Sequence, residues 1–110
     1  MILVFHWAPV ARRRSIERVG LKPGSLSRNR KWRPPFISFG TDPAWALASA
    51  DSYHDITEPM DLWEVDLEVV DFYESFSHSP DPHAPIVEMR VYARIPARHC
   101  TRLATREPED

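Results

Sequence analysis

Three short segments of this chain carry the side chains that could do chemistry. His6 lies in the segment VFHWA, Ser38 lies in FISFG, and Glu88 begins the segment EMRVY. A carboxylate held close to a sugar can stabilise the positive charge that develops when a glycosidic bond breaks. The segments are far apart in the sequence, so they form a site only if the fold brings them together.

Several other chemistries have no support in the sequence. The glycines are Gly20, Gly24 and Gly40, and their spacing matches neither a dinucleotide-binding fingerprint nor a phosphate-binding loop. No serine lies in a nucleophile-elbow pattern. The single cysteine, Cys100, excludes an intrachain disulfide and a zinc site built from thiolates. The histidines show no metal-ligand spacing on a helix, and we predict no metal site.

The elements that must position these side chains follow from local patterns. Residues 2–6 predict a strand that is apolar on both faces and therefore central in its sheet. A helix is predicted from Pro9 to about Val19. Gly20 can take a left-handed conformation after the helix, and Pro23 prevents its continuation.

The middle of the chain predicts a loop, a strand and a second helix. Residues 24–35 lack periodicity, which is typical of a long exposed loop. A short strand over 36–39 precedes a helix for which Asp42 is a suitable N-cap and Pro43 a suitable first residue. From Asp61 onward apolar and polar residues alternate, as in a strand with one wetter face.

The second half of the chain is predicted to be mostly strands. In a strand over 87–93, Glu88 shares a face with Arg90 and Tyr92. Together the elements predict a single α+β domain, with two helices in the N-terminal half and mostly antiparallel strands later. The other late elements are a strand at 71–76, a loop at 77–85, a closing strand at 100–103 and a frayed tail at about 104–110.

Composition is that of a soluble globular protein, with 43% hydrophobic and 27% charged residues. A chain of 110 residues allows one modest core and no separate cofactor domain. The early apolar stretch 1–5 is too short to span a bilayer, and it precedes the run Arg12-Arg13-Arg14. We therefore expect no membrane partner and a cytoplasmic location, whereas the sequence indicates no oligomeric state.

Basic residues concentrate in the first third of the chain, although the net charge of −2 gives no overall attraction to nucleic acid. We interpret them either as solvated side chains or as a rim that faces phosphate groups. They are Arg12, Arg13, Arg14, Arg18, Lys22, Arg28, Arg30, Lys31 and Arg33.

Taken in order, these segments resemble the ADP-ribosyltransferase fold, in the branch that includes diphtheria toxin, the poly(ADP-ribose) polymerases and bacterial toxins that modify DNA or protein. VFHWA and the later stop VGLKP are similar to a family strand with a histidine and a helix that ends in Gly-Leu-x-Pro. ISFGTDPA is similar to the second family block. EMRVY is similar to the third, in which the catalytic glutamate opens a strand ending in Val-Tyr. The resemblance implies a small split antiparallel sheet.

By this resemblance the chain is expected to be an NAD-dependent mono-ADP-ribosyltransferase, of a size that suits a toxin, an effector or a phage-borne modifier. NAD would be the co-substrate, and the partner a macromolecular acceptor, either protein or nucleic acid. Glu88 would be the catalytic carboxylate, and His6 would hydrogen-bond the adenosine-side ribose. Ser38, at the position of the family tyrosine, would lie at the nicotinamide pocket. Stacking would come from Trp7, Phe39 or Trp45, and pyrophosphate contacts from Arg12, Arg28, Arg30 or Arg33.

Two departures and several alternatives accompany this expectation. Trp7 stands where the family has a glycine, and Ser38 where it has a tyrosine. One alternative is an RNA 2′-phosphotransferase that uses NAD through a basic pocket. Others are an inactive copy that binds a nucleotide or a protein, and a protein that binds nucleic acid through residues 28–33. In purely structural terms, His6 could be a core histidine and Glu88 an exposed residue paired with Arg90.

Overall fold

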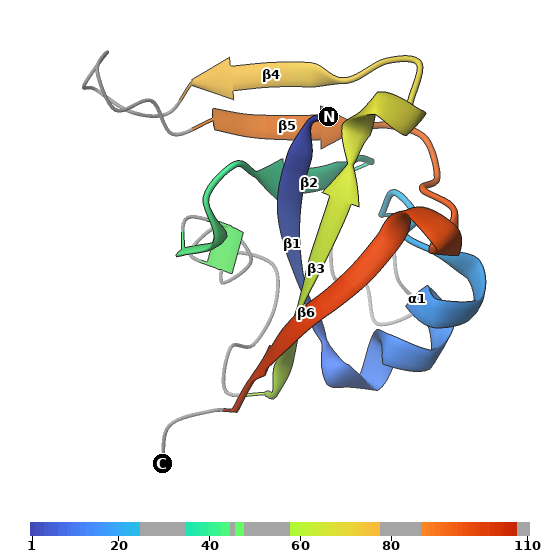
Figure 1. Ribbon diagram of the computed structural model, residues 1–110, viewed down its shortest axis with the longest axis vertical. Helices are drawn as coiled ribbons and strands as arrows, with labels where there is room; N and C mark the ends of the chain where they lie inside the picture. Colours follow the sequence, from blue (N-terminus) through green and yellow to red (C-terminus); the bar gives the residue numbers. More distant parts are fainter. Residues whose placement is uncertain (25–34, 45, 48–57, 78–86, 108–110) are drawn as a thin grey trace.

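The strands form one six-stranded antiparallel sheet in the order β4-β5-β2-β1-β3-β6 (Figure 1). A computed structural model describes residues 1–24, 35–44, 46–47, 58–77 and 87–107. The strands are β1 (Leu3–Pro9), β2 (Ile37–Gly40), β3 (Met60–Asp66), β4 (Glu74–Ser77), β5 (Val87–Val91) and β6 (Cys100–Arg106). They are accompanied by α1 (Arg13–Val19) and by the 3₁₀ turns η1 (Val10–Arg12), η2 (Leu67–Val69) and η3 (Ala97–His99). The chain is thus a small α+β domain.

The sheet has a weak seam between β1 and β2. Strand β1 pairs with β3 along its whole length, but it pairs with β2 only at Phe5 and Gly40. Figure 1 shows the consequence, with β4, β5 and β2 running across the view and β1, β3 and β6 running down it. The predicted central position of the first strand is confirmed, because β1 lies between β2 and β3.

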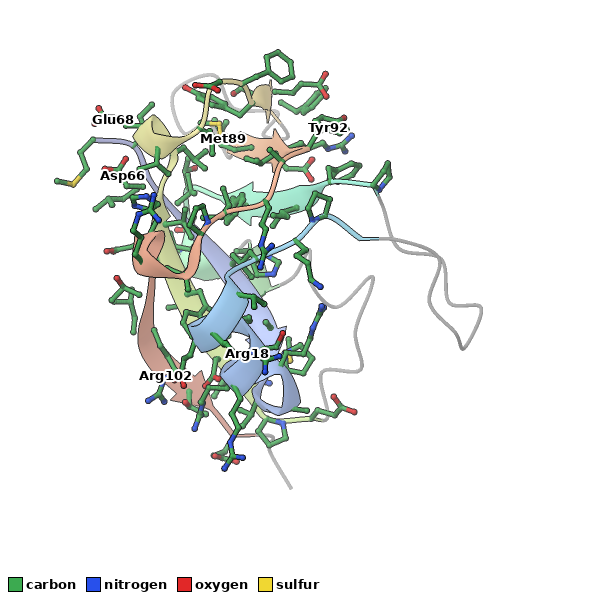
Figure 2. The ribbon with its side chains drawn as sticks, turned by 90° about the vertical axis from the view of Figure 1, so that its right-hand side faces the viewer. Arg18, Asp66, Glu68, Met89, Tyr92 and Arg102 are labelled. Carbon is green, nitrogen blue, oxygen red and sulfur yellow. The ribbon has the colours of Figure 1, made fainter. Side chains whose placement is uncertain are left out.

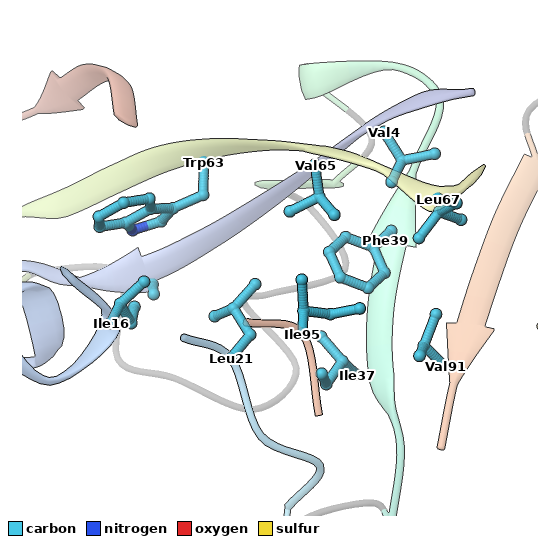
Figure 3. Packing of buried hydrophobic residues seen from close by; sticks show 11 residues of the cluster. Val4, Ile16, Leu21, Ile37, Phe39, Trp63, Val65, Leu67, Val91 and Ile95 are labelled. Carbon is cyan, nitrogen blue, oxygen red and sulfur yellow. The ribbon is translucent and has the colours of Figure 1, made fainter. Parts of the chain in front are cut away.

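The main hydrophobic core lies between the sheet and α1 (Figure 3). Phe39 and Val65 contribute fully buried side chains from the sheet, and Ile16 contributes the buried side chain of α1. Full burial of a side chain of this size contributes about 1.5–3 kcal/mol. A smaller cluster collects Trp7, Ala46, Met60 and Leu62. Alternate residues of β1 therefore enter separate cores, which agrees with a strand that is apolar on both faces.

Helix α1 ends at Gly20 because only a glycine fits there. Gly20 has a φ of +81° and donates its N–H to the Ile16 carbonyl at 2.8 Å. A Cβ atom on Gly20 would lie 1.8 Å from the carbonyl oxygen of Ile95. Leu21 then exchanges two main-chain hydrogen bonds with Ile95, of 2.9 and 2.8 Å. The predicted glycine stop is confirmed, and it allows the chain to pass closely over the segment that follows β5.

The ends of some predicted elements differ from those observed. Pro9 is the last residue of β1 and not the first of a helix, and η1 precedes α1. Strand β3 stops at Asp66, although the alternation continues, because the Asp66 side chain accepts the main-chain N–H groups of Glu68 and Ile2 at 3.1 and 3.0 Å. This local capping favours the turn η2 over continued strand. The closing strand extends beyond Leu103 to Arg106.

Part of the predicted second helix is observed. Residues 43, 44, 46 and 47 are helical, with Ala46 N–H bonded to the Asp42 carbonyl at 3.0 Å. The rest of that helix, most of the predicted loops at 24–35 and 77–85, and residues 108–110 lie outside the described residues. Within the described parts of the chain, no helix combines the length and the apolar character needed to cross a bilayer.

Candidate functional site

Glu88 is a buried carboxylate near the middle of the β4-β5-β2 half of the sheet, with 4% of its surface exposed. Its Oε2 accepts a hydrogen bond from the Ser38 hydroxyl at 2.6 Å, and its Oε1 lies 3.0 Å from Nη2 of Arg90. These partners compensate the cost of removing a carboxylate from water. The structural alternative for Glu88 was an exposed residue paired with Arg90. The pairing is observed, but Glu88 is buried and not exposed.

The register of the sheet explains how Ser38 reaches Glu88. Ser38 lies opposite Arg90, and Glu88 lies opposite Gly40. In an antiparallel pair, a residue and the diagonal neighbour of its partner share one face and lie within reach of each other. The Ser38 hydroxyl therefore meets the Glu88 carboxylate on one face of β2 and β5.

Arg90 is held between two aromatic rings. Its guanidinium carbon lies 4.4 Å from the ring centre of Phe36 and 4.5 Å from that of Phe76. Phe36 precedes β2, and Phe76 lies in β4 opposite Glu88. Such cation–π contacts restrict the guanidinium in addition to its ion pair. The sequence placed Arg90 on the face of Glu88 but gave no signal for the two rings, because they come from other parts of the sheet.

His6 lies at the seam between β1 and β2. Its Nδ1 is 2.9 Å from the main-chain carbonyl oxygen of Ser38, and its ring is 5.6 Å from that of Phe39. A carbonyl oxygen only accepts hydrogen bonds, so Nδ1 carries the hydrogen and, in the neutral ring, Nε2 is an acceptor. Burial lowers the pKa of His6 below its ordinary value, and the charge of Arg12 lowers it further. The imidazole is therefore neutral at pH 7.

Ser38 contacts the other two predicted catalytic side chains on opposite sides of β2, because the Glu88 carboxylate lies on the face of the Ser38 hydroxyl and the His6 ring lies against Phe39, whose side chain points into the core on the other face. Its carbonyl holds the His6 ring and its hydroxyl holds the Glu88 carboxylate. The two interactions use different atoms of one residue, so the order His6, Ser38, Glu88 is built directly into neighbouring strands. The Ser38 hydroxyl thus has a local task of its own, a hydrogen bond to the carboxylate.

The aromatic residues expected to stack on a ligand have packing roles in the described structure. Trp7 is 9% exposed, and its Nε1 donates to the Pro43 carbonyl at 2.8 Å. Phe39 is fully buried in the main core and supports the His6 ring. Trp45, the third such residue, lies outside the described residues.

Of the four arginines expected to contact a pyrophosphate, the structure describes Arg12. Arg12 is close enough to His6 for its charge to affect the pKa of the imidazole. Arg28, Arg30 and Arg33 lie outside the described residues. Among the described residues, no group of three His, Cys, Asp or Glu side chains is arranged to hold a metal ion.

One further arginine of the basic N-terminal third has a structural partner. Arg13 donates to Asp61 through Nε and Nη2, both at 2.8 Å, and Asp61 is fully buried. The Thr105 hydroxyl also donates to Asp61, at 2.6 Å. This interaction ties the start of α1 to β3 and β6, so Arg13 is part of the framework.

Comparisons of the chain with protein-family models, with curated proteins and with solved structures found no match. Function therefore has to be inferred from the geometry. The described arrangement offers a buried carboxylate on β5 with a fixed cation beside it, and a neutral imidazole on β1, both bonded to Ser38 of β2.

Proposed function

We propose that this chain is an NAD-dependent mono-ADP-ribosyltransferase in which Glu88 is the catalytic carboxylate. The observation that carries the proposal is the double use of Ser38, which binds His6 through its carbonyl and Glu88 through its hydroxyl. Three residues that the sequence resemblance selected from distant segments are thereby linked in neighbouring strands. The weak seam between β1 and β2, where His6 lies, also supports the split sheet that the resemblance implies.

The reaction breaks the bond between the ribose C1′ of NAD and the nicotinamide nitrogen. Nicotinamide leaves with the bonding electrons, and a nucleophilic atom of the acceptor forms a new bond to C1′ and loses a proton. Positive charge develops on the ribose in between, and the Glu88 carboxylate stabilises it. Ser38 and Arg90 keep the carboxylate in one orientation, which removes the cost of reorganising it during the reaction.

His6 would bind the co-substrate and take no part in proton transfer. With Nδ1 engaged by the Ser38 carbonyl, Nε2 presents a lone pair to a ribose hydroxyl. The lowered pKa keeps this lone pair free of a proton at neutral pH. This assignment agrees with the ribose contact that the resemblance implies.

The direct test is the release of nicotinamide from NAD by the purified chain, with and without added protein and nucleic acid acceptors. The Glu88→Gln variant should release nicotinamide at least about 100-fold more slowly, as expected for the loss of a group that stabilises a transition state. Glu64→Gln on β3, where Glu64 is partly buried, is the matched control and should retain the wild-type rate. Equal rates for wild type and Glu88→Gln would remove Glu88 as the catalyst. Activity that survives Glu88→Gln but is lost in Arg12→Gln would instead favour the phosphotransferase reaction.

A second candidate function is nucleotide binding without turnover. It is favoured by the engagement of both Glu88 oxygens, and by the burial of Trp7 at the position of the family glycine. Calorimetry with NAD and ADP-ribose separates the two candidates. An inactive binder should give heat with either compound and release no nicotinamide, whereas a transferase should consume NAD.

A further inference from the structure

An open hollow lined by three arginines lies at the end of α1, formed with the segment that follows β5. It has a volume of about 410 Å³, and its lining consists of Arg18, Val19, Arg94, Pro96, Ala97 and Arg98. Figure 2 labels Arg18 on the face of the molecule that α1 presents to the viewer. None of these residues belongs to the His6, Ser38 and Glu88 site.

The backbone beneath this arginine hollow is fixed. Leu21 and Ile95 exchange two main-chain hydrogen bonds, and Gly20 permits the close approach of the two segments. Arg94 donates its Nε to the Val19 carbonyl at 2.9 Å, which anchors the guanidinium and covers an oxygen at the end of the helix. The Arg94 guanidinium is thereby held in place, and Arg18 and Arg98 project from the fixed backbone around it.

The positive charge of the hollow is not compensated by the described residues. No described carboxylate forms an ion pair with Arg18, Arg94 or Arg98. Glu17, the neighbour of Arg18 on α1, contributes to the raised pKa of Arg13. Three guanidinium groups around one hollow repel one another unless an anion lies among them. The arrangement differs in this respect from Arg13 and Arg90, each of which has a carboxylate partner.

We propose that the arginine hollow binds phosphate groups of a nucleic acid strand. Guanidinium groups match phosphate oxygens with paired hydrogen bonds, so the ligand carries phosphate. A strand fits better than a single small anion, because the hollow is open and its cations come from α1 and from the segment after β5. The net charge of −2 gives no overall attraction to nucleic acid, so binding would depend on local positive charge such as that of the hollow.

The proposal goes beyond the proposed function and is tested without NAD. Fluorescence anisotropy measures the binding of a short labelled poly(dT) strand to the full chain at several salt concentrations. The double variant Arg18→Gln/Arg98→Gln should bind about tenfold more weakly at low salt, since two exposed ion pairs with phosphate are lost. The slope of log affinity against log salt should become shallower by about 1.4, as expected for two phosphate contacts on a single strand.

Arg102→Gln is the charge-matched control for Arg18→Gln. Arg102 is exposed on β6 and does not line the hollow. Arg18→Gln should weaken binding and Arg102→Gln should leave it nearly unchanged, with circular dichroism confirming that each variant folds. Equal losses in the two variants, or no binding by the wild type at low salt, would overturn the proposal. Displacement of the strand by inorganic phosphate alone, at matched ionic strength and at similar concentrations of phosphate groups, would assign the hollow to a small anion and also overturn it.

Measuring nicotinamide release beside strand binding distinguishes a failure of this proposal from a failure of the proposed function. Glu88→Gln should bind the strand as the wild type does, because Glu88 does not line the hollow. If the chain binds the strand but never consumes NAD, the nucleic-acid proposal stands and the proposed transferase function fails. A chain that consumes NAD but does not bind the strand would give the opposite result.

Discussion

The imidazole of His6 and the main-chain carbonyl of Ser38 meet where β1 and β2 separate, with Nδ1 2.9 Å from the oxygen. Only Phe5 and Gly40 pair these two strands. A side chain thus bridges the two strands where their main-chain pairing is limited. The His6 side chain therefore links the two strands across the seam, and the same hydrogen bond places the hydrogen of the neutral ring on Nδ1.

Removal of the Ser38 hydroxyl should weaken the site without disturbing His6. In Ser38→Ala, Glu88 loses a 2.6 Å hydrogen bond, whereas the carbonyl that binds His6 remains. We expect a loss of about 1–3 kcal/mol in the free energy of unfolding, measured in urea, because a buried carboxylate loses a donor. Nicotinamide release should also fall. Ser75→Ala, on the exposed part of β4, is the control, and wild-type behaviour of Ser38→Ala in both assays would contradict the role of Ser38.

Two substitutions of Arg90 should distinguish what its charge contributes to stability from what its planar guanidinium group contributes. Arg90→Gln removes the cation beside Glu88 and should cost about 2 kcal/mol in urea denaturation. This is less than the roughly 3–5 kcal/mol typical of fully buried pairs, since the Arg90 side chain is 29% exposed. Arg90→Lys keeps the charge but loses the planar contact with Phe36 and Phe76, so its stability should be intermediate. Equal stability of the Lys and Gln variants would show that the charge contributes little.

Protonation of His6 should destabilise the fold. Its pKa is lowered by burial, so the unfolded chain takes up the proton at a higher pH than the folded chain. Stability should therefore fall as the pH drops below about 6.5, the ordinary histidine value, and continue to fall until the folded pKa is reached. Thermal denaturation across this range, compared with His6→Gln, checks this contribution. An NMR titration midpoint for His6 at or above 6.5 would contradict the prediction.

The ion pair of Arg13 and Asp61 should be a major element of stability. Asp61→Asn should cost about 2 kcal/mol, less than the roughly 3–5 kcal/mol typical of fully buried pairs, because Arg13 would lose its partner but its side chain is 31% exposed and can reach water. The Arg13 hydrogen bonds lower the pKa of Asp61, so its contribution is present above about pH 3.9 and is lost as the pH falls through the lower folded pKa. Urea denaturation at pH 7 and at pH 3 measures both effects. Asp71→Asn at an exposed position is the control.

Replacement of Gly20 should be poorly tolerated. In Gly20→Ala the Cβ atom would approach main-chain atoms of Ile95, Pro96 and Ala97, and alanine is strained at the observed φ. The backbone preference alone costs about 1–2 kcal/mol, and the contact adds to it. Gly24→Ala, at a glycine without a positive φ, should be milder in thermal denaturation. Similar melting temperatures for the two variants would contradict the close packing at Gly20.

Local sequence patterns predicted the elements better than their ends. The apolar character of residues 2–6 indicated a central strand, and β1 does lie between β2 and β3, with both of its faces covered. The alternation from Asp61 did not reveal the end of β3, since Asp66 ends the strand through hydrogen bonds to Ile2 and Glu68. One of these partners is distant in the sequence and could not be recognised from spacing.

The sequence by itself determined the types and the faces of the residues in the candidate site. It selected His6, Ser38 and Glu88, and strand periodicity placed Arg90 beside Glu88. The tertiary structure decided which atoms meet, because strand order and register depend on pairing between distant segments. That pairing brings the Ser38 hydroxyl to Glu88 and places Phe36 and Phe76 around Arg90, and packing against the next segment buries Trp7 with its indole N–H bonded to the Pro43 carbonyl. Periodicity specifies which way a side chain points from its own strand, and only the packed sheet specifies what lies there.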